Sequence, residues 1–194
     1  MDYRKLGTSD LNISAVGLGT WAIAGPNWGF GWGPQNDDDS LDALERGLEG
    51  GMNWIDTAPV YGLGHAEDVV GRLLDRIPSS RRPLIFSKCS VTFDDNGEVG
   101  HSLKAASIAA EIEDSLRRLK TDTIDLMQIH WPSFPPGGPD EDIEEAMTAL
   151  AQAKQQGKIR AIGVSNFDPA QMARAQKVAP IASLQPPYSA IIRG

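Results

Sequence analysis

The sequence predicts an α/β fold of the (β/α)8 TIM-barrel type with an N-terminal β-hairpin, of which about six strands and five helices are present. Short apolar segments alternate with longer segments of helical periodicity along the whole chain. The apolar segments are almost continuously hydrophobic, as expected for parallel strands that are covered on both faces. Polar residues stand at the C-terminal end of nearly every apolar segment, and barrels of this type build their sites there.

The expected strands are the short apolar segments. Residues 3–16 come first and predict a hairpin, with its turn from Gly7 to Asp10. The parallel strands are then expected at residues 16–20, 53–57, 84–89, 124–130, 159–165 and 181–185.

The expected helices carry apolar stripes at spacings of three and four residues. They cover about residues 40–49, 67–77, 107–119, 142–156 and 168–178. The stripes of the first three are formed by Leu41, Leu44 and Leu48, by Val70, Leu73, Leu74 and Ile77, and by Ile108, Ile112, Leu116 and Leu119. Gly157 closes the fourth helix, and Asp168 with Pro169 predicts an N-cap and a first helical position for the fifth.

Two parallel architectures compete, a doubly wound open sheet and a (β/α)8 barrel. A dinucleotide site of the first kind needs a GxGxxG motif between a strand and a helix, and the glycine cluster at residues 29–33 follows no suitable turn. Polar strand ends instead favour the barrel. They are Thr20, Asp56, Lys88, His130, Ser165, Asn166 and Gln185. We expect residues 1–194 to form a single barrel domain that is incomplete at its C-terminus, because a closed barrel needs eight strands and about 250 residues.

The composition argues against several classes of partner. The chain has 18 Lys and Arg against 26 Asp and Glu, and this net charge of −8 predicts no binding to nucleic acid. Residues 1–20 contain no secretory signal, and no apolar run approaches the roughly 18–20 residues of a membrane helix. Cys89 is the only cysteine, and the three histidines lack a close ligand spacing, so we expect no disulfide and no metal site. These features predict a cytoplasmic protein.

Four polar residues form a candidate catalytic set: Asp56, Tyr61, Lys88 and His130. Each alone has an ordinary structural role, since an aspartate often caps a helix and a lysine often extends to solvent. All four are expected at the same end of the sheet, which favours a joint role. Such a set is suited to donating a proton to a carbonyl group while that group accepts hydride.

Hydride reduction of a carbonyl creates an alkoxide, which must be protonated or stabilised as it forms. A free tyrosine has a pKa of about 10, so it can donate a proton but does so slowly near neutral pH. An ammonium group at Lys88 would lower the pKa of Tyr61, and Asp56 would keep that lysine charged and in place. His130 could hydrogen-bond the carbonyl oxygen or share the proton with Tyr61. A distant alternative is an isomerase or aldolase in which Lys88 forms a Schiff base.

Several segments, in this order, resemble the aldo-keto reductase superfamily, and the resemblance runs essentially from end to end of the chain. They are Leu6-Gly7 with Leu18-Gly19-Thr20-Trp21, Ile55-Asp56-Thr57-Ala58 with Tyr61-Gly62, Phe86-Ser87-Lys88, Asp125-Leu126 with His130, Gly157-Lys158-Ile159-Arg160 with Ile162-Gly163-Val164-Ser165-Asn166-Phe167, and Leu184-Gln185 with Tyr188-Ser189. The stretch from Trp21 to Gly33 is most similar to a bacterial branch that includes general-stress and inositol-related reductases.

The resemblance implies an enzyme that uses NADPH, with NADH as the alternative cofactor, to reduce an aldehyde or ketone to an alcohol. It implies that Tyr61 is the proton donor, that Asp56 and Lys88 tune it, and that His130 orients the carbonyl. The cofactor-binding residues that it implies are Gly19, Thr20, Trp21, Asp56, Ser165, Asn166 and Gln185.

The expected partner is a small-molecule carbonyl substrate, and the full-length protein is expected to be a monomer or a weak homo-oligomer. A group of aromatic residues is expected to wall the substrate pocket, because an apolar wall with few polar groups suits a small molecule. They are Trp21, Trp28, Phe30, Trp32 and Trp131. The alternatives are a non-catalytic nucleotide-sensing or binding subunit and an inactive fragment of the same fold.

Overall fold

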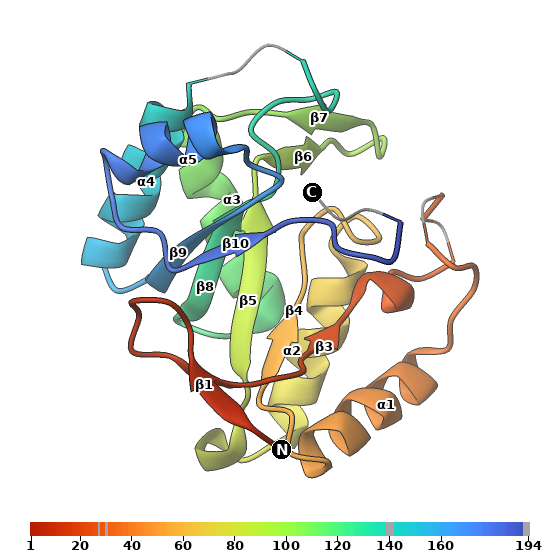
Figure 1. Cartoon of the computed structure of the whole chain (residues 1–194). Helices are drawn as coiled ribbons and strands as arrows, with labels where there is room; N and C mark the ends of the chain where they lie inside the picture. The colour runs from red at the N-terminus through yellow and green to blue at the C-terminus, as the bar shows by residue number, and fades with distance from the viewer. Residues whose placement is uncertain (27, 30, 139–141, 192–194) are drawn as a thin grey trace.

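The computed structural model describes residues 1–26, 28–29, 31–138 and 142–191. Within these residues, six parallel strands form one sheet in the order β10-β9-β8-β5-β4-β3. The sheet is curled into part of a barrel, which confirms the predicted fold class (Figure 1). The strands are β3 (Leu18–Gly19), β4 (Trp54–Asp56), β5 (Leu84–Cys89), β8 (Ile124–Ile129), β9 (Ile159–Ser165) and β10 (Ser183–Gln185).

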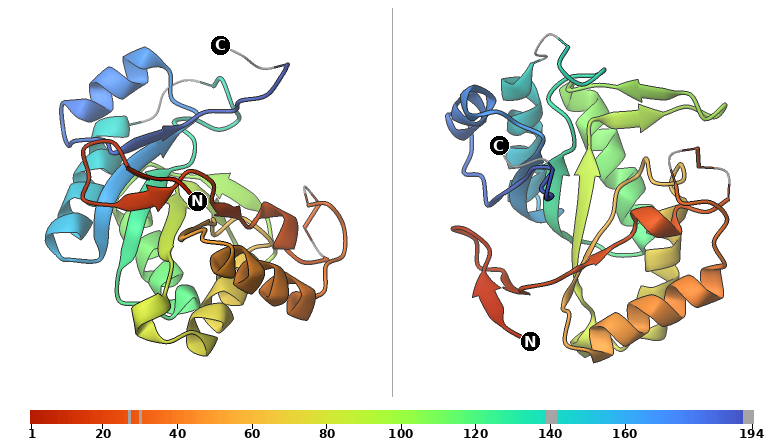
Figure 2. Two further views of the ribbon diagram at one scale, coloured as in Figure 1. Left: turned by 60° about the horizontal axis from the view of Figure 1, so that its bottom comes forward. Right: turned by 45° about the vertical axis from the view of Figure 1, so that its right-hand side comes forward.

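Within the described residues, five α-helices lie on the outer side of the curved sheet (Figure 2). They are α1 (Asp37–Glu49), α2 (His65–Arg76), α3 (Ala105–Leu119), α4 (Ile143–Gln155) and α5 (Pro169–Gln176). Two short 3₁₀ segments, η1 (Trp21–Ile23) and η2 (Ser79–Arg81), lie between them. In this part of the chain no helix is both long enough and apolar enough to cross a membrane.

Capping residues explain where two of the helices begin. Helix α1 starts three residues earlier than predicted, because the side chain of Asn36 accepts a hydrogen bond from the backbone N–H of Asp38. The predicted N-cap of α5 is confirmed: Asp168 accepts from the N–H of Gln171 at 2.8 Å, and the Gln171 side chain accepts from the N–H of Asp168 at 2.9 Å. This reciprocal pair is a capping box, which satisfies two N–H groups that the helix itself leaves unpaired.

Two antiparallel hairpins stand outside the main sheet. The predicted N-terminal hairpin is formed by β1 (Tyr3–Lys5) and β2 (Asn12–Ser14) and lies across the N-terminal end of the strands (Figure 1). The second hairpin, β6 (Val91–Phe93) with β7 (Val99–His101), was not predicted and extends beyond the C-terminal end of β5. The carboxylate of Asp94 in its turn accepts from the N–H groups of Asn96 and Glu98.

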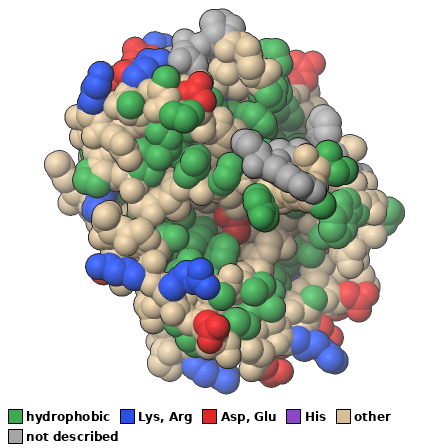
Figure 3. All heavy atoms as spheres, in the orientation of Figure 1, with side chains coloured by type: hydrophobic (Ala, Val, Ile, Leu, Met, Phe, Trp, Pro, Cys, Tyr) green, Lys and Arg blue, Asp and Glu red, His purple; other side chains and the backbone are tan. Residues whose placement is uncertain are grey.

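Side chains of each strand alternate between the two sides of the sheet. On the outer side, residues such as Ile85, Met127 and Val164 pack against the helices and form the main core. On the inner side, Phe86 and Leu126 pack against the N-terminal hairpin and close that end of the sheet. Figure 3 shows hydrophobic side chains gathered around a hollow on the face that Figure 1 presents. The inner side near the C-terminal strand ends is therefore the place where polar side chains can meet a ligand.

Candidate active site

A buried ion pair occupies the inner side of the sheet between two neighbouring strands. Lys88 of β5 is 2% exposed, and its Nζ lies 2.5 Å from Oδ1 of Asp56, the last residue of β4. The same Nζ donates to the carbonyl oxygen of Thr57 at 2.9 Å. Burial by itself lowers the pKa of Lys88, but Asp56, with Tyr61, outweighs burial and the pKa is raised. The lysine is therefore charged, as the sequence predicted.

Gln128 of β8 holds the second oxygen of Asp56, and the sequence analysis missed it. It lies opposite Lys88 in the strand register, and its Nε2 donates to Oδ2 of Asp56 at 3.2 Å. Gly163 of β9 makes room for it, because a Cβ there would lie 3.0 Å from Cγ of Gln128. The signal was present: Gln128 is a polar residue inside an apolar strand, two positions before His130 and so on the same side of the sheet.

Tyr61 lies in the loop after β4, directly beside this ion pair. Lys88 Nζ is 5.0 Å from the centroid of the Tyr61 ring, and the rings of Tyr61 and His130 meet edge to face with centroids 5.8 Å apart. Burial raises the pKa of Tyr61, and the lowering by Lys88 does not overcome it. Lys88 acts on this pKa in the predicted direction, but loss of solvent around the phenol has the larger effect. Tyr61 is thus protonated at neutral pH and can act as a proton donor.

His130 follows β8 and is neutral at physiological pH. Burial, followed by the charge of Lys88 and the proximity of His101, lowers its pKa to about 3. A neutral imidazole carries one N–H donor, which can hydrogen-bond a carbonyl oxygen, but it cannot supply a proton as an imidazolium would. Of the two roles predicted for His130, its environment favours orientation of the carbonyl.

We expect the ring of His130 to stay neutral in the folded protein at all pH values above about 4, because its pKa is held at about 3 instead of 6.5. The unfolded chain binds this proton at a higher pH than the folded chain. The contribution of His130 to stability is therefore complete above pH 6.5 and is lost as the pH falls toward 3. Long-range ¹H–¹⁵N NMR of the imidazole would measure this, with acid-unfolded protein as the control. A midpoint near 6.5 in the folded state would contradict it.

The predicted cofactor-binding residues lie in two groups at the two edges of the sheet. At one edge, Gly19 of β3 pairs with Asp56 in the register, the buried Thr20 donates its N–H to the carbonyl of Asp56 at 3.0 Å, and Trp21 begins η1. Their backbone therefore runs directly past the ion pair.

At the other edge, Ser165 and Gln185 end β9 and β10 and pair with each other. Ser165 Oγ donates to the carbonyl of Gln185 at 2.8 Å. Asn166 has a left-handed backbone, with φ of 61°, and its Nδ2 donates to the carbonyl of His130 at 2.9 Å. This second group is thereby connected to His130.

A cavity of about 520 Å³ lies beside these residues. Its volume is within the range of roughly 300–1,000 Å³ that is usual for small-molecule sites. Tyr61, His130 and Asn166 contribute its polar groups. Its remaining wall is apolar and is formed by Trp21, Trp28, Val60, Val91, Val99, Trp131, Phe134 and Pro136. Two of these, Val91 and Val99, come from the β6–β7 hairpin, so the hairpin that the sequence analysis missed is part of the cavity wall.

Three of the five predicted wall residues, Trp21, Trp28 and Trp131, line this cavity. Trp32 does not, because it stands in the segment that leads away to α1, and its side chain is 82% exposed. Phe30 lies outside the described residues. In the part of the chain that the structure describes, no group of three or more histidine, cysteine, aspartate or glutamate residues is arranged to hold a metal ion.

The sequence and fold match those of known proteins along nearly the whole chain. Residues 15–193 match the model of the aldo/keto reductase family. The chain belongs to this family. Aldo-keto reductase YhdN of Bacillus subtilis is 39% identical over 97% of this chain, and the NADH-specific methylglyoxal reductase of Escherichia coli is 35% identical over 97%. The solved glycerol dehydrogenase AKR11B4 of Gluconobacter oxydans is 42% identical, with a TM-score of 0.85 over 99% of this chain.

This aldo-keto reductase chain spans only part of the length of these proteins. It covers 54% of the Bacillus subtilis relative, 59% of the Escherichia coli relative and 57% of the solved Gluconobacter oxydans chain. The matched part contains the strands that carry the ion pair, Tyr61 and His130.

Proteins of this family use nicotinamide cofactors, and two buried side chains of this chain suit such a ligand. Among the described residues, the side-chain oxygens Thr20 Oγ1 and Gln185 Oε1 are buried without a hydrogen-bond partner. An unpaired buried acceptor is costly, so a bound group that donates hydrogen bonds would relieve both. The carboxamide of a nicotinamide carries N–H donors that suit Gln185, and the adjoining ribose carries O–H donors that suit Thr20, so the residues present fit this cofactor.

Proposed function

We propose that this aldo-keto reductase catalyses the NADPH-dependent reduction of an aldehyde or ketone to an alcohol, with NADH as the alternative cofactor. The observation that carries the proposal is the buried Lys88–Asp56 ion pair beside a protonated Tyr61 on the wall of an apolar cavity. Lys88 Nζ is 5.0 Å from the centroid of the Tyr61 ring. Charged and titratable groups that meet on the wall of a ligand-sized cavity are typical of a functional site.

Each residue of the set has a defined part in this reaction. Tyr61 donates its hydroxyl proton to the oxygen of the substrate as the alkoxide develops. Lys88 then faces the phenolate that is left, and its positive charge stabilises that anion. Asp56, held by Gln128, keeps the ammonium group in place. The neutral His130 donates a hydrogen bond to the carbonyl oxygen and so fixes the substrate next to Tyr61.

The nicotinamide cofactor supplies the hydride when it is bound. When the cofactor is bound, Gln185, Asn166 and Ser165 would hold its carboxamide, and Gly19 and Thr20 would contact the adjoining ribose. The name of the Escherichia coli relative, an NADH-specific methylglyoxal reductase, keeps NADH in the proposal beside NADPH.

A deuterium-transfer experiment tests the proposed reaction. The protein, in the form that its gene encodes, is incubated with NADPH or NADH deuterated at C4 of the nicotinamide and with a panel of neutral aldehydes and ketones. We expect one deuterium in the product alcohol by mass spectrometry, with a higher kcat/KM for one cofactor. Nucleotide binding without any label in any product would contradict the reductase proposal and favour a nucleotide-sensing subunit.

A further inference from the structure

Ser90, which follows β5, is buried and connects three segments of the chain. Its N–H donates to Oε2 of Glu111 at 2.9 Å, and its carbonyl accepts from the N–H of Ser102 at 2.9 Å. Its hydroxyl donates to the carbonyl of Trp131 at 3.1 Å and accepts from the N–H of the same residue at 3.3 Å. Ser90 is thus fixed on one side by α3 and itself fixes the backbone of a residue on the cavity wall.

The backbone of Ser90 is strained. Its φ is 88°, in the region that side chains with a Cβ rarely adopt. Such a conformation persists only where the surroundings hold it in place. Of the groups around Ser90, Glu111 supplies the one charged acceptor, and a hydrogen bond to a carboxylate is stronger than one to a neutral oxygen.

Trp131 is the residue of the cavity wall to which the Ser90 hydroxyl is hydrogen-bonded. It lines the cavity immediately after His130, whose N–H donates to the carbonyl of Cys89 at 2.9 Å. The paired segments Cys89–Ser90 and His130–Trp131 therefore prolong the contact between β5 and β8 beyond the ends of these strands. His101 also contacts the Trp131 carbonyl, at 2.9 Å.

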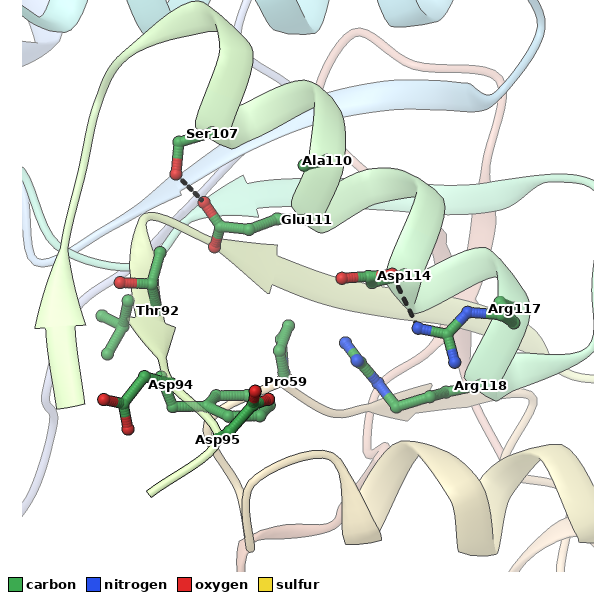
Figure 4. Close-up of a pocket in the computed structure, with 12 residues that line it drawn as sticks. Pro59, Thr92, Asp94, Asp95, Ser107, Ala110, Glu111, Asp114, Arg117 and Arg118 are labelled. Atoms are coloured by element: carbon green, nitrogen blue, oxygen red, sulfur yellow. Dashed lines mark hydrogen bonds and ion pairs between the residues drawn. The ribbon is translucent and has the colours of Figure 1, made fainter. Parts of the chain in front are cut away.

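Glu111 holds Ser90 from outside the substrate cavity, whose lining does not include it. It lies on α3 and borders a second cavity of about 370 Å³ between α3 and β6 (Figure 4). Its Oε1 accepts from Ser107 Oγ at 3.2 Å. The charged side chains around it are Arg118 with its ion-pair partner Glu67, and Asp94, Asp95, Asp114 and Arg117 on the cavity wall. Burial raises the pKa of Glu111 to about 7, against the lowering by the N–H of Ser90.

We propose that Glu111 is a positioning residue for the substrate pocket: its carboxylate holds the N–H of Ser90, keeps Ser90 in its left-handed conformation, and so lets the Ser90 hydroxyl fix Trp131 beside His130. The effect on catalysis rests on the proposed reductase function, whereas the connection from Glu111 to Trp131 does not. The two can therefore be tested separately.

NMR spectroscopy tests the connection without any assay of activity. In ¹⁵N-labelled protein we expect the backbone amide signals of Ser90 and Trp131 to shift together with pH, with a midpoint at about 7. In Glu111→Gln, whose amide oxygen still accepts a hydrogen bond, both shifts should disappear. Ser107→Ala is the matched control, because it removes a hydrogen bond to Glu111 but leaves the one to Ser90, so the shifts should persist with a higher midpoint.

Two results would overturn the connection. One is a Trp131 amide that does not move while the Ser90 amide titrates. The other is a Trp131 titration that survives in Glu111→Gln, which would assign it to a group other than Glu111.

Steady-state kinetics with an aromatic aldehyde tests the consequence for substrate binding. We expect Glu111→Ala to lower kcat/KM by roughly ten- to a hundredfold, with most of the change in KM, since a small displacement of a substrate-positioning group has effects of this size on catalysis. Glu111→Gln should restore KM to near the wild-type value at neutral pH. Glu113→Ala on the same helix, where Glu113 pairs with Lys158 on the surface, should change neither constant. A wild-type KM in Glu111→Ala would overturn the positioning role, whereas an inactive wild type would contradict only the reductase proposal.

Discussion

Replacing Tyr61 with Phe is expected to lower kcat/KM for carbonyl reduction by about 10²- to 10⁴-fold, which is the usual contribution of a positioned general acid. Phe retains the ring that meets His130 edge to face and that lies beside Lys88 Nζ, so the change removes little more than the hydroxyl. The measurement is the initial rate of cofactor oxidation with a neutral aldehyde, at saturating cofactor.

Two controls show whether the loss is chemical. Cofactor affinity, measured by nicotinamide fluorescence, should be unchanged in Tyr61→Phe. The free energy of unfolding, measured with urea, should fall by no more than about 1.5 kcal/mol, the contribution of one hydrogen bond. An unchanged turnover number in a correctly folded variant would show that another group supplies the proton.

Replacing Lys88 with Met should lower the free energy of unfolding by about 3–5 kcal/mol, because it leaves the carboxylate of Asp56 buried without its cation. Gln128 still donates to one oxygen of that carboxylate, but a single neutral donor cannot replace the ammonium group. Reductase activity should fall as well, since the phenolate of Tyr61 loses the charge that stabilises it. Urea unfolding followed by circular dichroism measures the change in stability.

The matched control is the double variant Asp56→Asn/Lys88→Met, which removes both charges. It should recover much of the lost stability, because a buried pair is less costly to replace as a whole than to break. Reductase activity should not return in the double variant. If Lys88→Met were as stable as the wild type, solvent or another group would have to be neutralising Asp56.

The alternating strands and helices could be predicted because each is indicated by residues that are close together in the sequence. Strands β5 and β9 begin and end as predicted, since a continuous apolar segment between polar residues leaves little choice. The parallel order of the strands then brings Asp56, Lys88 and His130 to one end of the sheet, as the sequence analysis expected. The chemical roles of these residues remain predictions.

What the sequence did not predict depends on contacts between distant residues. The β6–β7 hairpin interrupts the strand–helix alternation, although Asn96-Gly97 is a turn signal. Glu67 is fully buried near the start of α2, where it accepts from Ser87 Oγ at 2.6 Å and pairs with Arg118 at 2.7 Å. Helical periodicity places Glu67 in the apolar stripe, three residues before Val70, but its partners come from a strand and another helix, so the local sequence does not show how its charge is balanced.

The alternation of side chains along β5 limits how the length of this strand can change in evolution. Lys88 and Phe86 face inward, whereas Ser87 reaches Glu67 of α2 and Cys89 joins the outer core. An insertion or deletion of one residue within the strand before Lys88 would turn Lys88 to the outer side of the sheet. Its ammonium group would then lie in the apolar layer under the helices. Length changes within β5 should therefore be tolerated only in pairs of residues. The loops that follow the strands can change in length by any number of residues. Substrate preference can therefore diversify in the loops while the ion pair stays in register.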